Sequence, residues 1–298
     1  MRVLNIGSMN LDYVYSVDHI VLPGETESTS KIHVYLGGKG MNQSVALAKA
    51  GVSVYQGGMI GQDGQPFLDA CAEFGIHSEY IARSAGKTGH AVIQIDKNAQ
   101  NSILLYGGAN QCLTKAYVDE VLSHFDSGDI LLLQNEVNLL PYMIDKAYGQ
   151  GMQIVLNPSP FHDNLAAADL SKVSIFLLNE VEGNQLTGQT SPDEILVEMN
   201  RRFPQSRIVL TLGEKGAIYF DGREKYFQPI FPVNAVDTTA AGDTFTGYFL
   251  AGLVEGLSIP SALKLSAKAS SIAVSRTGAV PSIPYRKEVE DALAKEPS

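Results

Sequence analysis

Hydrophobic and polar positions divide the chain into two kinds of segment. Between residues 114 and 212, short apolar runs such as Ile130 to Leu133 and Ile175 to Leu178 alternate with amphipathic stretches such as Pro192 to Phe203. Fully apolar strands separated by helices are typical of a parallel sheet that is covered on both faces. The pattern therefore predicts an α/β fold, a doubly wound and mostly parallel sheet with helices on both faces.

Two other regions, at about residues 12–36 and 89–106, show the alternation of half-buried strands. Strands with one polar and one apolar face do not fit a sheet that is buried on both sides. We therefore expect these regions to form a small separate β-sheet, a lid on the larger one. No linker or repeat interrupts the chain, so residues 1–298 are expected to form a single domain.

The stretch Asp237-Thr-Thr-Ala-Ala-Gly-Asp243 lies between an apolar extended run, Phe227 to Val236, and an apolar helical run, Phe245 to Leu257. This order predicts a strand-like segment, a tight turn and a helix. The amides at a helix N-terminus are unpaired and carry a partial positive charge, which suits a phosphate or a developing anion.

Within this stretch, Ala240, Ala241 and Gly242 allow the backbone to approach a ligand closely. Asp243 has two interpretations. It is either the N-cap of the helix, or a general base that accepts the proton of an alcohol while the neighbouring amides hold the transferring phosphoryl group.

A glycine-rich segment, Gly37-Gly-Lys-Gly-Met-Asn42, precedes an amphipathic helix predicted over Gln43 to Ala50. Its spacing is not that of a P-loop, which argues against a nucleotide hydrolase of that class. The segment is either a plain loop with Asn42 near an N-cap, or a site where Lys39 and Asn42 hold hydroxyls or a phosphate.

Polar side chains follow several predicted strands, at the edge where open α/β sheets bind ligands. Asn10 and Asp12 could bind adjacent sugar hydroxyls or form an Asx turn. Glu136 is either a ligand group or a solvated loop acid. Asn179 and Glu182 could organise water on Mg²⁺, or cap the start of a helix.

Two further turns are weaker signals. Thr211-Leu-Gly-Glu-Lys-Gly216 joins a predicted strand to a glycine turn, and Arg276-Thr-Gly-Ala-Val-Pro-Ser282 follows a helix. The carbonyl groups of the second turn could bind a monovalent cation, or the turn could simply end the helix.

Composition excludes several classes of protein. The net charge is −10, which argues against a nucleic-acid partner, and no apolar run is long enough to span a membrane. Cys71 and Cys112 lie far apart without metal-ligand spacing, and the N-terminus does not resemble a signal peptide. We therefore expect a protein of the reducing cytoplasm.

The glycine-rich segment and the Asp237–Phe245 stretch, in this order and at this separation, resemble the two signatures of the ribokinase (PfkB) family of carbohydrate kinases. The resemblance covers essentially the whole chain. It implies an α/β domain with a β-sheet lid and ATP-dependent phosphorylation of a sugar. The implied acceptor is the 5-hydroxyl of D-ribose, with Mg²⁺ and an activating K⁺.

The resemblance also implies roles for individual positions. The implied base is Asp243, with an anion hole formed by Ala240, Ala241 and Gly242. The implied sugar contacts are Asn10, Asp12, Gly38, Lys39, Asn42, Glu136 and Asp243. The implied nucleotide and magnesium positions are Asn179, Glu182, Thr211, Gly213, Glu214, Gly216, Gly242, Asp243 and Ala267. The implied potassium positions are Asp237, Thr239, Ala273, Arg276, Gly278 and Ser282.

Three residues depart from the family pattern: Met41, Leu178 and Ala267. Met41 is expected to narrow the sugar pocket, which leaves a kinase for another sugar or a nucleoside as the alternative. In ribokinases the lids of two subunits clasp, so the resemblance also implies a homodimer formed through the lid.

Overall fold

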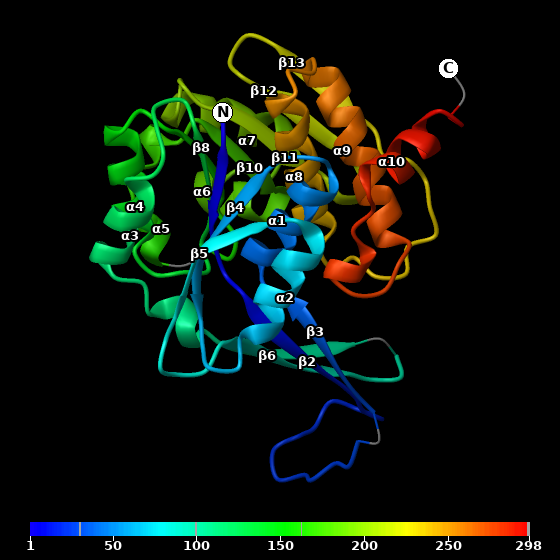
Figure 1. Cartoon of the computed structure of the whole chain (residues 1–298). Coiled ribbons are helices and arrows are strands. Elements are labelled where there is room, and N and C mark those ends of the chain that lie inside the picture. Colours follow the sequence, from blue (N-terminus) through cyan, green and yellow to red (C-terminus); the bar gives the residue numbers. More distant parts are fainter. Residues whose placement is uncertain (30, 99, 162, 297–298) are drawn as a thin grey trace.

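The computed structural model describes residues 1–29, 31–98, 100–161 and 163–296, and contains two separate sheets (Figure 1). The large sheet has nine strands in the order β13-β12-β11-β10-β9-β8-β1-β4-β5. In this order they are Lys225–Gln228, Ala217–Phe220, Arg207–Thr211, Ile175–Asn179, Gln153–Asn157, Ile130–Gln134, Val3–Ile6, Val54–Ile60 and His77–Arg83.

Strands β11 to β5 of this sheet are parallel, and β12 and β13 add an antiparallel hairpin at one edge. The helices α1 to α10 are Lys39–Lys49, Gln65–Phe74, Lys115–Leu122, Leu140–Gly149, Asp163–Ala166, Glu180–Thr187, Pro192–Arg202, Ala241–Val254, Ile259–Val274 and Arg286–Leu293. None of the helices in the described ranges has the length and hydrophobicity that crossing a bilayer requires.

Each face of the large sheet has its own hydrophobic core. Along β8, Ile130 and Leu132 pack with residues of α1, α8 and α9, whereas Leu131 and Leu133 pack with residues of α3, α4 and α7. Successive side chains of a strand point to opposite faces, so a strand buried on both sides must be apolar throughout. The predicted doubly wound α/β fold is confirmed.

The second sheet has four strands in the order β3-β2-β6-β7, and it projects beyond the large sheet on the side where β1 ends (Figure 1). The strands are β2 (Asn10–Ser16), β3 (Ile32–Gly37), β6 (Gly89–Ile95) and β7 (Asn101–Tyr106). The two regions with alternating residues therefore do form a small separate sheet, as predicted. Residues 30 and 99 of these regions lie outside the described residues.

The expectation of a strand-like segment before the Asp237 stretch is wrong for most of its length. Strand β13 ends at Gln228, and residues 229–236 are irregular. Pro229 and Pro232 have no N–H to donate to a neighbouring strand, which explains why this apolar run does not extend the sheet.

Candidate active site

Helix α8 begins where the sequence predicts an anion site. Ala240 is its N-cap and has a left-handed conformation with φ of 59°, which is uncommon for a residue with a side chain. Asp243 lies in the first turn of the helix and is 6% exposed. The interpretation of Asp243 as the N-cap is therefore wrong.

The Asp243 carboxylate is held from the neighbouring helix α1. Asn42 Nδ2 donates to Oδ2 at 2.9 Å, and Gln43 Nε2 donates to Oδ1 at 2.8 Å. Charge-assisted hydrogen bonds of this kind are stronger than neutral ones, so the side chain has a defined orientation. The sequence singled out Asn42 but not Gln43.

The turn before Asp243 leaves room for a ligand. The Ala241 amide donates to the Thr238 carbonyl at 3.2 Å. The amides of Gly242 and Asp243 donate to no acceptor among the described residues. A Cβ built on Gly242 would have no heavy atom within 4 Å. Free amides beside open space at a helix N-terminus are suited to an anion.

Helix α1 starts earlier than predicted, because the glycine-rich segment forms its first turn. Gly38 is the N-cap with φ of 88°, and a Cβ on Gly40 would lie only 2.4 Å from the Gly7 carbonyl carbon. Glycine is required here because the helix crosses directly over the end of β1. The alternative of a plain loop with Asn42 near an N-cap is therefore wrong.

The expectation that Met41 narrows the sugar pocket is also wrong. Its side chain is fully buried in the core between the large sheet and α1 and α8. Its amide donates to the Ser8 carbonyl at 3.0 Å, which aims the side chain at the core rather than at the site.

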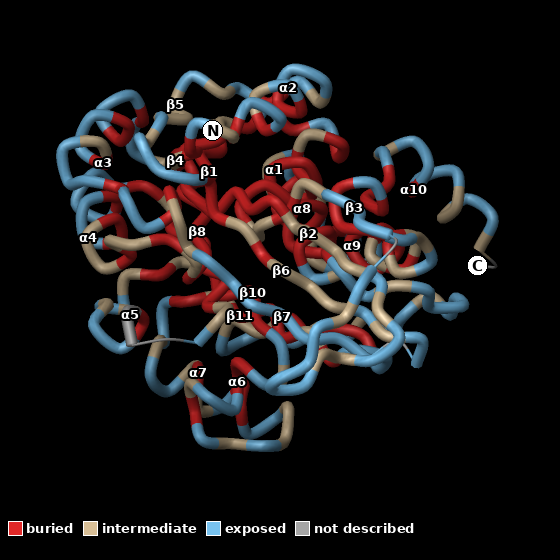
Figure 2. Tube along the Cα trace, turned by 90° about the horizontal axis from the view of Figure 1, so that it is seen from below, coloured by how far each residue is buried: buried red, intermediate tan, exposed pale blue. Residues whose placement is uncertain are grey.

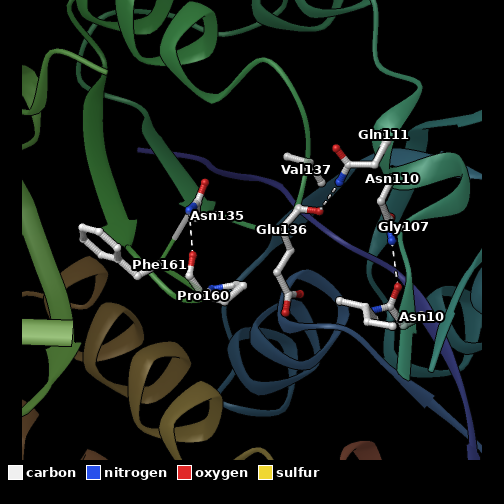
Figure 3. Close-up of a pocket in the computed structure, with 10 residues that line it drawn as sticks. Asn10, Gly107, Asn110, Gln111, Asn135, Glu136, Val137, Pro160 and Phe161 are labelled. Carbon is white, nitrogen blue, oxygen red and sulfur yellow. Dashed lines mark hydrogen bonds between the residues drawn. The ribbon is translucent and has the colours of Figure 1, made fainter. Parts of the chain in front are cut away.

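A cavity of about 520 Å³ lies beside α1, between the end of β8 and the small sheet. Figure 3 shows the Glu136 side chain projecting between Asn10 on one side and Pro160 and Phe161 on the other. The Glu136 carboxylate accepts hydrogen bonds from Ser8 Oγ and from the Lys39 amide, the latter at 3.0 Å. Glu136 is thus an ordered group of the site and not a solvated loop acid.

Asn110 and Gln111 line this cavity and were missed. Asn110 Nδ2 donates to Asn10 Oδ1 at 2.8 Å, and Gln111 Nε2 donates to the Glu136 carbonyl at 2.9 Å (Figure 3). Both residues orient predicted sugar contacts. The available signal was the polar pair that directly follows Gly107-Gly-Ala109 at the end of a strand.

Asp12 and Lys39 are half-buried and electrostatically coupled to the site. Burial raises the pKa of Asp12 to about 7, and the negative charge of Glu136 adds to this effect. Burial alone lowers the pKa of Lys39, but the charges of Asp243, Glu136 and Glu182 outweigh it and raise the pKa overall. The Lys39 ammonium therefore stays charged under the influence of the carboxylates of α8, of the cavity and of α6.

The residues predicted for the nucleotide lie at the ends of β10 and β11. Asn179 and Glu182 form a capping box at the start of α6, in which Asn179 Oδ1 accepts from the Glu182 amide at 2.9 Å. These contacts are those expected for the capping alternative.

The other residues predicted for the nucleotide lie further along the chain. Thr211 pairs in register with Asn179, and Gly213 and Glu214 form the turn that follows it. Ala267 is buried on α9. Gly216 packs against the Gln228 carbonyl, where a Cβ would lie at 2.1 Å.

The residues predicted for potassium join two loops beside the N-terminus of α8. Asp237 accepts hydrogen bonds from the amides of Thr239 and Gly278, each at 2.9 Å. Burial opposes ionisation of Asp237, but hydrogen bonding from the Thr239 side chain and from these two amides outweighs it and holds the pKa of Asp237 below the usual value. Ala273 precedes the loop over 276–282 and Ser282 ends it, and both residues are buried. The Arg276 guanidinium pairs with Glu288.

No group of three or more His, Cys, Asp or Glu side chains within the described ranges is placed to hold a metal ion. The predicted potassium positions offer instead the Asp237 carboxylate, the hydroxyls of Thr239 and Ser282, and main-chain carbonyls. Oxygen donors of this kind fit a hard cation such as K⁺.

Comparison with known proteins identifies the family of the chain. Residues 2–286 match the sequence profile of the pfkB family carbohydrate kinases. The chain is 36% identical over 297 residues to a ribokinase from Haemophilus influenzae, covering 97% of both chains, and 29% identical over 303 residues to a deoxyribokinase from Salmonella typhi, covering 99% of both. A structure of Arabidopsis thaliana ribokinase complexed with ribose and ATP superposes with a TM-score of 0.86, at 30% identity, covering 99% of both chains.

A match of this extent defines the class of protein, a sugar kinase. The chain belongs to the pfkB family of carbohydrate kinases.

Proposed function

We propose that the chain uses ATP to phosphorylate the primary 5-hydroxyl of D-ribose, forming ribose 5-phosphate. The main support for this proposal is the geometry at the junction of α1 and α8. There the Asp243 carboxylate is oriented by Asn42 and Gln43, next to open space at the Gly242 amide. A base and an anion site at one point are what phosphoryl transfer to an alcohol needs.

In the proposed reaction, Asp243 accepts the proton of the 5-hydroxyl while the sugar oxygen attacks the γ-phosphorus. The bond from the γ-phosphorus to the β,γ-bridging oxygen breaks in line, and ADP leaves. The amides of Gly242 and Asp243 stabilise charge on the transferring group. Ala240 and Ala241 shape the turn that presents them, so the anion hole is proposed to run from Ala240 to Gly242.

The other hydroxyls of the sugar would be held by groups on three elements. Asn10 and Asp12 are on β2, Lys39 and Asn42 are on α1, and Glu136 follows β8. The small sheet would close over the sugar as a lid and exclude water, which favours transfer to the sugar over hydrolysis of ATP.

On the nucleotide side, Asn179 and Glu182 would bind water molecules of a Mg²⁺ ion, and the turn from Thr211 to Gly216 would border the nucleotide. Bound Mg²⁺ neutralises charge on the phosphates. The ionised carboxylate of Asp237 and the carbonyls of the loop over 276–282 would hold K⁺ beside the N-terminus of α8.

The outer face of the small sheet supports a homodimer as the working form. By the strand register, Val34, Tyr13, Val92 and Leu104 lie side by side on this face. Val34 is 53% and Leu104 is 72% exposed. An apolar face this open is expected to be covered by a partner, and a second copy of the chain is the proposed one.

A second candidate is a related acceptor, either 2-deoxyribose or a nucleoside. The similarity to a deoxyribokinase favours the first, and the Pro160 and Phe161 wall of the cavity favours an acceptor with an apolar substituent. Wild-type protein should be assayed for ADP release with ribose, 2-deoxyribose, hexoses and nucleosides, with and without K⁺. The proposal predicts the highest kcat/KM for ribose and activation by K⁺. A clear preference for another acceptor would overturn the choice of ribose.

A further inference from the structure

One of the two side chains that hydrogen-bond to the Asp243 carboxylate lies in the protein core. Gln43 is fully buried and donates from Nε2 to Asp243 Oδ1, whereas Asn42 donates to Oδ2. Gln43 therefore acts on the carboxylate from the side of the protein core. Its amide supports the carboxylate only if its NH₂ group, and not its oxygen, faces Asp243.

A series of buried amides fixes that choice. The Gly40 carbonyl can only accept, so the Asn5 amide must present Nδ2 to it, at 2.8 Å. Asn5 Oδ1 then faces Gln134 Nε2 at 3.0 Å, and Gln134 Nε2 also donates to Gln43 Oε1 at 2.6 Å. With its oxygen engaged in this way, Gln43 is left with Nε2 toward Asp243. Asn5, Gln43 and Gln134 are all fully buried.

A second set of hydrogen bonds fixes the orientation of Asn5 in the same sense. The Gly57 carbonyl accepts from Gln56 Nε2 at 2.6 Å, so Gln56 Oε1 accepts from the Ser44 hydroxyl, also at 2.6 Å. The Ser44 oxygen in turn accepts from Asn5 Nδ2 at 2.8 Å. Reversal of one amide would bring like groups together, at a cost that is high in a buried network.

We propose that Gln43 is a positioning residue for phosphoryl transfer, held by this directed series of amides so that its NH₂ group fixes the Asp243 carboxylate. The inference rests on the proposed function, in which Asp243 is the base. Without the Gln43 donor the carboxylate would lose one of its two amide partners and could rotate.

Few other charges act on Asp243 from the helices that pack against α8. On α1, the Lys39 ammonium is coupled to Asp243 and also to Glu136 and Glu182. On α9, Lys264 is exposed and Lys268 pairs with Glu296. A change at Gln43 leaves all of these charges in place, so a fall in kcat would report the lost hydrogen bond.

The test measures kcat and sugar KM of the full-length Gln43→Met and Gln134→Met variants. In Gln43→Met, kcat should fall by about 10- to 100-fold, the effect of one lost hydrogen bond to a charged group, with sugar KM within about 3-fold of wild type. Gln134→Met should also lower kcat, but by a smaller factor. If Gln43→Met fails to fold, Gln134→Met carries the test, since it leaves the Gln43 donor in place and removes the group that orients it.

Ser206→Ala is the matched control, because Ser206 is 2% exposed and loses a buried hydrogen bond to the Val173 carbonyl far from Asp243 in the sequence. It should lower the melting temperature and leave kcat and sugar KM unchanged. A folded Gln43→Met variant with wild-type kcat would overturn the proposal. If wild-type protein phosphorylates no acceptor, the proposed function fails instead. Crystal structures of wild type and Gln43→Met would then decide the positioning role, which predicts a rotated Asp243 carboxylate and is overturned by an unmoved one.

Discussion

The junction of α1 and α8 and the small sheet differ in how much of their structure is fixed internally. At the junction, both oxygens of Asp243 have amide partners and the side chains around it are buried. In the small sheet, every residue of β7 is exposed (Figure 2). One region is a packed core that contains the polar groups of the site, and the other is a sheet with an outermost strand that is exposed along its whole length.

This difference matches the two tasks that the proposed reaction sets. A general base must be held in one geometry before the substrate arrives, because reorganisation during the reaction would raise the barrier. A cover must move to admit the sugar, and segments with few buried contacts open at low free-energy cost. Substitutions at the junction should therefore impair chemistry or folding, and those on the outer face of the small sheet should mainly affect assembly.

The largest effect is expected for Asp243→Asn. The amide cannot accept the hydroxyl proton, so kcat should fall by about 10²- to 10⁴-fold while the protein stays folded and binds sugar. Steady-state kinetics and sugar binding by calorimetry measure the two quantities. Asp193→Asn is a matched control, since Asp193 also lies in the first turn of a helix but is paired with Lys225 at the surface. Wild-type turnover by Asp243→Asn would remove this residue from the mechanism.

A smaller effect, on stability, is expected where the two helices touch. A Cβ on Gly247 would lie 2.4 Å from the Ala46 Cβ, so Gly247→Ala should force α8 away from α1 and lower the free energy of unfolding by about 1–3 kcal/mol. Gly149→Ala on α4 is the control, because a Cβ there meets nothing within 4 Å and should stabilise the helix by about 0.5–1 kcal/mol. Urea denaturation measures both. Equal effects of the two substitutions would contradict close packing at the junction.

Asp12, at the boundary between the two regions, should give a moderate dependence on pH. Its pKa is raised to about 7 from an ordinary value of 3.8, so the folded protein binds the proton more tightly than the unfolded chain. Stability should therefore decline as pH rises from about 4 to 7. Sugar KM should fall over the upper part of that range, since only the ionised group accepts hydrogen bonds from two hydroxyls.

The variant Asp12→Asn separates these two effects. It should have a high sugar KM that does not vary with pH, and a higher melting temperature than wild type at pH 8. Asp18→Asn, an exposed acid that follows the same strand, should show neither change. A steep pH dependence of KM that persists in Asp12→Asn would assign the titration to another group.

The smallest effect on chemistry is expected on the outer face of the small sheet. Leu104→Ser should change the free energy of unfolding of the protomer by no more than about 0.5 kcal/mol, because Leu104 is exposed in the single chain. It should weaken the proposed homodimer, which sedimentation over a range of concentrations would measure. If wild-type protein is monomeric at all concentrations, the dimer proposal fails.

The sequence predicts the large sheet well and its edge poorly. Apolar runs such as Ile130 to Leu133 identify central strands, because a strand buried on both faces has no polar position. The edge strand β5 was not predicted, since its polar and partly exposed residues show no clear period. Strand β12, next to the other edge, was not predicted because it has only 4 residues. The start of α1 was missed because glycine has a low helix propensity, and only its contact with Gly7 explains a helix there.

The sequence identifies candidate groups of the site but not what holds them. Asp243 and Asn42 lie in recognisable motifs, whereas the partners that orient them come from distant parts of the chain. Gln134 lies 91 residues from Gln43, and Asn110 lies 100 residues from Asn10. The one local signal was that Gln43 occupies the same helical stripe as buried Leu47, where a polar residue needs a buried partner.

The most direct measurement of the central claim is a crystal structure of the protein with ribose and a non-hydrolysable ATP analogue. We predict that the 5-hydroxyl oxygen lies about 2.6–3.2 Å from a carboxylate oxygen of Asp243, and that the γ-phosphate faces the Gly242 amide. A sugar bound with its 5-hydroxyl directed away from Asp243, or a γ-phosphate remote from the α8 N-terminus, would contradict the account.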